Sequence, residues 1–426
     1  MLIELFGKNF GCFRDEFRLS MLATDIDRDS ERGVVNVKVE GDPEPLRLLR
    51  CAAIYGANAS GKTTVLEAAA SLRHLIGEST IVGLKATEHY YRPFALGDIR
   101  GGPVELGARV LIGGHVYEYR VTYEKERIRS ERLVCLDSNN EDVLIDRVDQ
   151  KVRGLWMDDD RVRLITEDFR PHSLVLSLAS QFSPTLAEPV SLGLTNSLIW
   201  WANADIHDDT IQPVFVIQQM VRDNEYATWT AKHLRRADVG TLDVRAQLAP
   251  RTPYSLGGYL VPADPQKTTG SSPDDLLNYE LSFYHKSVEG AIPLTYADES
   301  AGTRHWLNLA PMLYELEQSN SEWAFFVDEL DGSLHPTLLC EAVRRINARP
   351  ADSIGPQVIF TAHETALIDG EAQSAILRRD QVYLTEKDET GAATLKSLVE
   401  FKERQVSNMR KRYLAGRYGA IPIVGD

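Results

Sequence analysis

The chain has 426 residues, of which 43% are hydrophobic and 26% charged, and its formal net charge is −15. This composition is that of an ordinary globular protein with a large core, and the negative charge argues against a protein that coats nucleic acid over its whole surface. No apolar run approaches the roughly 18 residues of a membrane span. The widely spaced cysteines and the absence of a signal-peptide pattern lead us to expect a reduced, cytoplasmic protein.

The N-terminal part contains a strand, a glycine-rich loop and a helix in that order. The mostly apolar run 48–55 predicts a buried strand. Residues 56–63 then read G-x-x-x-x-G-K-T, and apolar residues recur at helical spacing over 65–76, up to Gly77. This order is the one that a phosphate-binding loop requires, because the N-terminus of the helix must face the phosphates.

Each residue type in the loop has a chemical purpose. Glycines allow consecutive backbone N–H groups to turn toward phosphates, Lys62 reaches the terminal phosphates, and the Thr63 hydroxyl ligates Mg²⁺. The motif therefore predicts ATP and Mg²⁺ as cofactors. The predicted nucleotide contacts in this loop are Gly56, Asn58, Ser60, Gly61, Lys62, Thr63 and Thr64.

The middle of the chain changes from a strand pattern to a helical one. Residues 103–137 partly alternate between apolar and polar side chains around Gly113-Gly114, which predicts an antiparallel hairpin. From about residue 171 to 289 the apolar positions, among them Trp200 and Trp201, suit helices, and 262–275 reads as a loop.

The C-terminal part alternates strands and helices again. Residues 325–327 and 358–360 are short apolar strands, and the segment between them contains a helical pattern from Leu338 to Ile346. This alternation predicts a parallel sheet. Because the phosphate loop and the acidic pair Asp328-Glu329 must meet in one site, we interpret the helical middle as an insertion into one composite domain.

Three residues in this part are candidates for the chemistry. Asp328 follows three apolar residues, and Mg²⁺ held together with Thr63 would compensate the cost of burying its carboxylate. Glu329 would point to the other side of the strand and act as general base. His363 follows a strand and would sense the terminal phosphate. The alternatives are that the acidic pair caps the next helix and that the histidine is structural.

This set of motifs resembles the ABC-type ATPase head of the RecF and structural-maintenance-of-chromosomes (SMC) class of AAA proteins. The resemblance implies that Ser300 and Gly302, in a Ser-Ala-Gly-Thr element, touch the ATP of an opposite subunit. It also implies that Asn9 lies near the nucleotide and that Gln181 belongs to the Q-loop. Residues 331–336 are similar to the D-loop, which crosses the dimer interface.

The resemblance gives the expected fold and domains. The fold is an α/β ABC-type head, with a mixed β-sheet, a parallel sheet with flanking helices and an inserted mainly helical arm. The expected divisions are an N-terminal lobe (1–140), the arm (141–290) and a C-terminal lobe (291–426). Ala59 replaces a glycine common in the family, so we expect ordinary backbone dihedrals at that position.

The end of the chain resembles stand-alone bacterial ATPases of abortive infection and anti-phage defence. This implies an Mg²⁺-dependent ATPase that works as a homodimer or higher homo-oligomer and controls a separate nuclease or toxin. The basic segment 402–417 is a solvated or partner-docking tail, or else a contact for nucleic acid. The alternatives are an ATPase-nuclease, with Glu386 and Asp388 as its first acids, and the ATPase subunit of a transporter.

Overall fold

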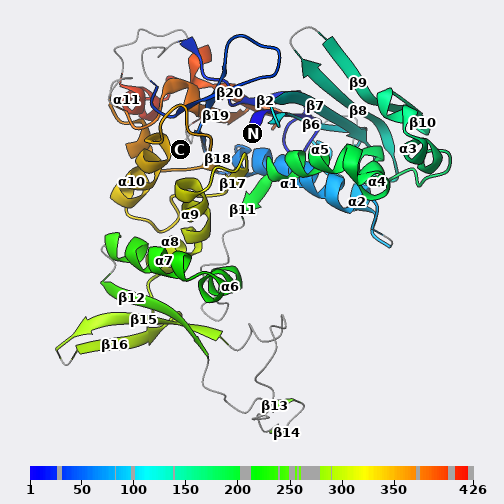
Figure 1. Cartoon of the computed structure of the whole chain (residues 1–426). Helices are drawn as coiled ribbons and strands as arrows, with labels where there is room; N and C mark the ends of the chain where they lie inside the picture. The colour runs from blue at the N-terminus through cyan, green and yellow to red at the C-terminus, as the bar shows by residue number, and fades with distance from the viewer. Residues whose placement is uncertain are drawn as a thin grey trace. The chain divides into compact units, whose positions relative to one another are not determined.

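The computed structural model describes most of the chain (Figure 1). The described residues are 1–25, 31–81, 83–96, 101–137, 140–201, 213–237, 240–248, 255–256, 259–260, 279–288, 290–370, 375–401 and 408–420. They form two compact units. The first comprises Met1–Ala202, Ser319–Asp331 and Leu339–Asp426, and the second comprises Asn203–Gln318 and Gly332–Leu338. These bounds differ from the divisions at residues 140 and 290, because the strands after residue 140 pair with the N-terminal sheet.

A seven-stranded antiparallel sheet forms one layer of the first unit, in the order β10-β9-β8-β7-β6-β1-β2. The turn between β6 and β7 is Gly113-Gly114, with φ angles of 57° and 88°. Positive φ at both positions is what a tight hairpin turn needs, so the predicted hairpin is confirmed. The strands are β1 (Leu2–Lys8), β2 (Phe17–Ser20), β6 (Val104–Ile112), β7 (His115–Tyr123), β8 (Ile128–Asp137), β9 (Asn140–Val148) and β10 (Lys151–Arg153).

A six-stranded sheet forms a second layer, in the order β11-β17-β18-β5-β19-β20. Its strands are β5 (Cys51–Gly56), β11 (Ile199–Trp201), β17 (Ala324–Val327), β18 (Gln357–Thr361), β19 (Val382–Lys387) and β20 (Ala393–Ser397). All neighbours pair in parallel except β19 and β20. The predicted parallel sheet is confirmed. Trp200 and Trp201, which the pattern placed among helices, instead lie in β11, where aromatic side chains suit the pleated surface.

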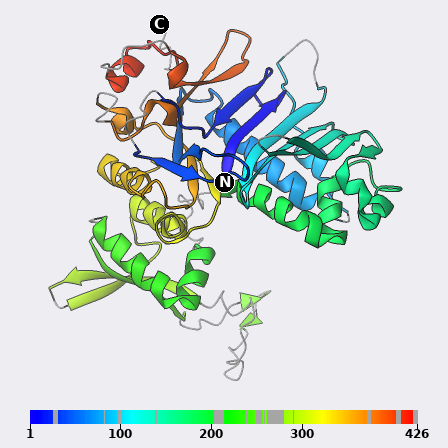
Figure 2. The same ribbon diagram turned by 45° about the horizontal axis from the view of Figure 1, so that its top comes forward.

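Helix α1 (Lys62–Glu78) connects these layers, because its apolar face belongs to the same buried core as residues of both sheets. Each fully buried leucine on that face, such as Leu66 or Leu72, contributes about 1.5–3 kcal/mol relative to an exposed one. In both views α1 runs beside α4 and α5 (Figures 1 and 2). The other helices of this unit are α2 (Ala86–His89), α3 (Asp160–Ile165), α4 (Val175–Phe182), α5 (Pro184–Asn196), α10 (Pro336–Asn347, from Leu339 on) and α11 (Met409–Leu414).

Gln357, which is fully buried at the start of β18, ties the two sheets together. Its Oε1 accepts from the backbone N–H of Leu2 at 2.8 Å, and its Nε2 donates to the carbonyls of Leu2 at 3.1 Å and Leu49 at 2.9 Å. A buried amide whose donors and acceptor are all used fixes the position of β1 against β18.

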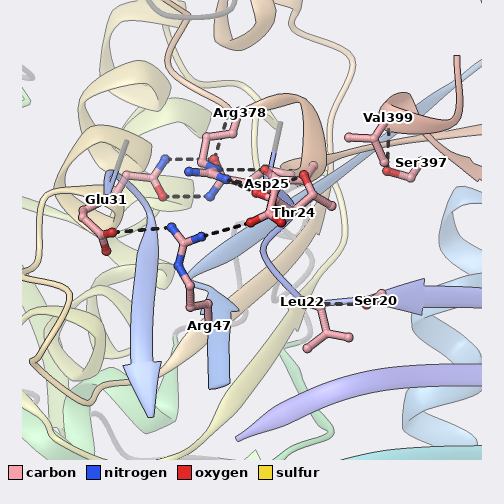
Figure 3. Close-up of polar contacts among 12 residues, drawn as sticks. Ser20, Leu22, Thr24, Asp25, Glu31, Arg47, Arg378, Ser397 and Val399 are labelled. Carbon is pink, nitrogen blue, oxygen red and sulfur yellow. Dashed lines mark hydrogen bonds and ion pairs between the residues drawn. The ribbon is translucent and has the colours of Figure 1, made fainter. Parts of the chain in front are cut away.

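Charged residues join the N-terminal segment to the C-terminal part of the first unit. Arg47, on β4 (Leu46–Leu49), lies between Asp25 at 3.9 Å and Glu31 at 3.5 Å (Figure 3). Strand β4 pairs with β3 (Val34–Val37). The buried pair Arg378–Asp380 is 2.7 Å apart, and the Asp380 carboxylate also accepts from the backbone N–H of Thr24.

The second unit combines helices with a three-stranded antiparallel sheet, in the order β12-β15-β16. Its elements are α6 (Val214–Arg222), α7 (Asn224–Arg236), β12 (Thr241–Leu248), β13 (Ser255–Leu256), β14 (Tyr259–Leu260), β15 (Tyr279–Ser287), β16 (Gly290–Thr295), α8 (Ala301–Asn308) and α9 (Ala310–Gln318). The sheet accompanies the helices that the pattern predicted. The predicted loop 262–275 lies outside the described residues. In the part of the chain that the structure describes, no helix is long and apolar enough to cross a membrane.

Candidate active site

The candidate active site of the first unit lies where β17, β18 and β5 end. In the parallel register Val327 is opposite Phe360, and Thr361 is opposite Ile54. The residues that follow these strands therefore meet at one edge of the sheet. In open α/β sheets this carboxyl edge is where ligands bind.

The phosphate loop follows β5 and leads directly into α1. Gly61 caps the helix with a φ of 117°, in a region that residues with a Cβ rarely adopt, and a Cβ there would lie 2.8 Å from Cys12 Sγ. Ser60 Oγ lies 2.6 Å from Thr385 Oγ1 on β19, so the neighbouring strand braces the loop. The predicted loop residues thus form one continuous turn at the helix N-terminus, which is an anion-binding geometry.

Lys62 is held against the loop that it belongs to. Its Nζ donates to the carbonyls of Gly56 at 2.9 Å and Ala57 at 3.1 Å. Burial lowers the pKa of Lys62, while the nearby carboxylates of Asp328 and Glu329 favour its charged form. A buried ammonium beside carbonyls is a strong attractor for a phosphate oxygen, because little water competes for it.

The expectation of ordinary backbone dihedrals at Ala59 is wrong. Its φ is 60°, in the left-handed region. An L-residue with a Cβ pays about 1–2 kcal/mol for this conformation. The turn of the loop imposes the conformation whichever residue stands there, so alanine in place of glycine carries a cost in strain.

A chain of hydrogen bonds links the phosphate loop to the acidic pair. Thr63 Oγ1 donates to Asp328 Oδ2 at 2.9 Å, and Thr361 Oγ1 donates to Asp328 Oδ1 at 2.6 Å. A threonine hydroxyl beside a carboxylate presents the hard oxygen donors that Mg²⁺ prefers. The residues present therefore fit a magnesium ion at Thr63 and Asp328.

Glu329 lies in a turn, so the alternation of side chains along a strand does not set its direction. β17 ends at Val327, and Glu329 lies in the turn that follows, with a φ of 48°. Its backbone N–H donates to Thr361 Oγ1 at 2.7 Å, which holds this left-handed conformation. The interpretation of Glu329 as the next residue of the strand is therefore corrected. Strained backbone held by its surroundings is common at functional sites.

Thr361 is a positioning residue for both acids, and this can be tested by replacing it. We expect Thr361→Val to lower the turnover of ATP by about 10- to 100-fold, because small misplacements of catalytic groups have effects of this size. It should also lower the free energy of unfolding by about 1–3 kcal/mol, since the N–H of Glu329 loses its acceptor. Thr361→Ser keeps the hydroxyl and should retain both properties. Steady-state kinetics and urea unfolding measure them, and equal turnover in the two variants would contradict the role.

His363 is fixed through its backbone. Asp331 Oδ2 accepts from the N–H of His363 and from that of Glu364, each at 2.7 Å. The imidazole of His363 is exposed at the same edge of the sheet. The carboxylate of Asp331 thus joins the segment after β17 to the segment after β18, which brings His363 and Asp328 to one edge.

Asn9 contacts loops of its own chain. Its Oδ1 accepts from the N–H of Phe94 at 3.1 Å, and its Nδ2 donates to the carbonyls of Gly101 and Pro103. Nearby, Cys12 Sγ lies 3.5 Å from Thr64 Oγ1 at the start of α1. The N-terminal element therefore reaches the phosphate loop through Cys12, and a direct contact of Asn9 with the nucleotide stays a prediction.

Gln181 does not lie at the phosphate loop. Its Nε2 donates to Thr80 Oγ1 at 2.6 Å, just beyond the C-terminal end of α1, whereas Lys62 begins that helix. A helix of 17 residues is about 25 Å long. The predicted Q-loop contact is therefore corrected, because one helix length separates Gln181 from the loop.

The signature residues lie in the second unit. Ser300 caps α8, where its Oγ accepts from the N–H of Thr303 at 3.1 Å. Gly302 allows a close approach of the backbone, because a Cβ there would lie 2.8 Å from the carbonyl oxygen of Ser333. The start of α8 and the segment 333–338 therefore pack closely together, and both line one cavity.

The basic tail is partly used within the chain. Lys402 and Arg404 lie outside the described residues. Arg410, on α11, pairs with Asp369 at 2.9 Å and donates to Thr365 Oγ1 at 3.1 Å. These bonds attach α11 to the segment after His363, so this part of the tail packs on the first unit.

Thr361 and Thr385 were missing from the predicted site residues, and Asp331 was named only as part of the D-loop pattern. Thr361 had a usable signal, since it is a polar residue directly after the apolar strand 358–360 and two residues before His363. Asp331 stands in the D-loop pattern. Thr385 had no such signal, because it reaches Ser60 only through the pairing of β19 with β5.

Comparison with known protein families shows which family the chain belongs to. A family model described as "AAA domain, putative AbiEii toxin, Type IV TA system" matches residues 51–188 and 204–369. The chain belongs to this family. The match includes the phosphate loop, Asp328-Glu329 and His363, so the chain is an AAA ATPase and the predicted class is confirmed. Among curated proteins, no sequence matches the chain.

Solved structures of SMC heads are similar to the chain at low identity. An SMC head bound to the C-winged helix domain of ScpA is 11% identical, with a TM-score of 0.48, and the match covers 93% of this chain and 97% of that one. The SMC head domain from Thermotoga maritima is 12% identical, with a TM-score of 0.38, and the match covers 93% and 98%.

Proposed function

We propose that the chain is an Mg²⁺-dependent ATP-driven switch, in which two copies enclose ATP between them and hydrolysis separates them. The observation that carries the proposal is the hydrogen-bonded chain Thr63–Asp328–Thr361–Glu329, which connects a phosphate loop to a carboxylate beside it. In an ATPase these are the groups that bind phosphate, hold the metal and activate water.

Each residue has a role in the proposed reaction. Lys62 and the loop N–H groups bind the phosphates, and Thr63 and Asp328 would hold Mg²⁺, which supplies positive charge to the phosphate oxygens. Glu329, exposed beside Asp328, takes the proton of the attacking water as general base. His363 hydrogen-bonds the terminal phosphate, and its position depends on Asp331.

The second copy completes the site in this proposal. Ser300 and Gly302 line a cavity whose lining residues include none from the phosphate loop or the acidic pair. The resemblance to ABC-type heads assigns such a surface to the ATP of the opposite subunit. Ser300 and Gly302 of one copy would therefore contact the phosphates bound by Lys62 of the other.

The association of Glu329→Gln with ATP tests this proposal. We expect this variant to bind ATP without hydrolysing it and to become a dimer on ATP addition, as measured by light scattering. Glu329→Gln combined with Lys62→Ala is the matched control and should remain a monomer. A Glu329→Gln protein that stays monomeric at saturating ATP would overturn the dimer.

The switch is proposed to act in the cytoplasm on a separate effector, a nuclease or toxin, in anti-phage defence. Support comes from the family to which the chain belongs, whose description names the AbiEii toxin and a type IV toxin–antitoxin system. Affinity capture from the native host, with and without a non-hydrolysable ATP analogue, identifies such a partner. Plasmid cutting by the purified chain that survives Lys62→Ala would favour the alternative of an ATPase-nuclease instead.

A further inference from the structure

A cavity of about 570 Å³ opens in the second unit beside the signature residues. It lies between the end of α7, the start of α8 and the segment 333–338. Its polar lining consists of Arg236, Ser300, Thr303, Ser333, His335 and Thr337. The volume is within the range of small-ligand sites, which is about 300–1,000 Å³.

The chemistry of this lining suits an anion. Hydroxyl groups and a guanidinium donate hydrogen bonds, and in the described part of the chain no acidic residue lines the cavity. Arginine next to hydroxyl donors is a pattern that recognises phosphate oxygens.

A stack of aromatic rings anchors the end of the helix that carries Arg236. The ring of His233, 2% exposed, lies between Trp229 at 4.6 Å and Trp306 at 4.3 Å, nearly parallel to both. Trp306 Nε1 also donates to the carbonyl of His233 at 3.3 Å. Because Trp306 is on α8, this stack anchors the last turns of α7 on the signature helix.

Arg236 and its neighbour Arg235 differ in what they contact. Arg236 lies three residues after His233, which places it on the anchored face of α7, and it lines the cavity. Arg235 instead donates from its Nε to the carbonyl of Ala231 on its own helix. Two exposed arginines of one helix end therefore offer a test residue and a matched control.

We propose that Arg236 binds the terminal phosphates of the ATP held by the phosphate loop of a second copy. The inference rests on the proposed function and extends it, because Arg236 lies on α7, outside the signature element itself. A single guanidinium among hydroxyls favours one polyphosphate over a nucleic acid, whose binding needs several cations along a surface. The second unit would thereby sense the nucleotide directly.

Dimerisation in the Glu329→Gln background gives the first test. We expect Arg236→Ala to weaken the ATP-dependent dimer by about 10- to 100-fold, the loss typical for a hydrogen bond between charged groups. Arg235→Ala should leave the dimer unchanged, and Arg236→Lys should retain part of the affinity. ATP binding by the monomer, measured by calorimetry, should not change in any of these variants.

Mixing two impaired variants tests whether the contact crosses between copies. Lys62→Ala lacks the phosphate contact and Arg236→Ala lacks the proposed one, but their mixed dimer contains one site with both residues intact. We therefore expect mixing to raise ATPase activity above the sum of the activities that the two variants show alone. Activity that is no greater than this sum would show that Arg236 acts within its own copy and would overturn the proposal.

The outcomes separate this inference from the proposed function. If Glu329→Gln alone does not dimerise with ATP, the proposed function fails. If it dimerises and Arg236→Ala has no more effect than Arg235→Ala on the dimer or on turnover, only the inference fails. Unchanged dimerisation together with weaker binding of a labelled single-stranded oligonucleotide by Arg236→Ala would assign the residue to nucleic acid and also overturn the inference.

Discussion

Replacing Glu329 by glutamine should slow ATP turnover by about 10²- to 10⁴-fold, the usual effect of losing a general base. Glutamine has the same shape and should accept the same left-handed backbone, since the hydrogen bond from its N–H to Thr361 Oγ1 is unaffected by the side chain. Lys62, Thr63 and Asp328 keep their contacts, so the affinity for ATP should stay near that of the native protein. Single-turnover kinetics and equilibrium ATP binding measure the two quantities separately.

Glu364 is the matched control for this prediction. Its carboxylate lies close in sequence to His363 but accepts from the N–H of Ala366, at the start of a short helical turn. Glu364→Gln should therefore leave turnover within a few-fold of native. A loss of less than about tenfold in Glu329→Gln, or an equal loss in both variants, would show that another group activates the water.

The elements that sequence predicted best are those that local pattern determines. The apolar runs before Gly56, Asp328 and Thr361 became β5, β17 and β18, because continuous apolar strands suit a sheet that is covered on both faces. Once these strands pair in parallel, the residues after them must meet at one edge. The phosphate loop and the acidic pair could therefore be predicted to come together.

The predictions that failed concern features that depend on pairing with distant residues or on backbone conformation. Nothing near Trp200 and Trp201 indicates that they join β17 as a strand, since their partners follow more than a hundred residues later. Gln181 was assigned from a short resemblance, which carries no information about the length of α1. The left-handed conformation of Ala59 comes from the loop around it and contradicts the intrinsic preference of alanine.

The residues that connect the parts of the site to one another were also hard to predict, for a physical reason. Thr361 and Thr385 act through single hydroxyl groups, and a threonine in a strand is ordinary in any sheet. Arg236 differs from Arg235 because it lines the cavity beside Ser300, at a helix end that the stack of His233 with two tryptophans anchors. Such roles depend on which side of an element is anchored, and that is a property of packing.

A second large effect is expected at Glu131 and Arg147, which form a fully buried ion pair between β8 and β9, 3.7 Å apart. The Glu131 carboxylate accepts from the N–H groups of Val175 at 2.7 Å and Leu176 at 2.9 Å, at the start of α4. Arg147 in turn donates to the carbonyl of Ser173. The pair therefore attaches α4 to the antiparallel sheet.

We expect Glu131→Gln to lower the free energy of unfolding by about 3–5 kcal/mol, because it leaves the Arg147 charge buried without its partner. The neighbouring pair Arg132–Glu141 joins the same two strands at the surface, with side chains 46% and 58% exposed, and is the matched control. Glu141→Gln should cost less than about 1 kcal/mol. Urea unfolding measures both, and similar losses in the two variants would contradict the role of the buried pair.

A double replacement tests whether the two side chains act as a pair. Combining Glu131→Gln with Arg147→Met should cost less than the sum of the single changes, because the second change removes the charge that the first leaves unpaired.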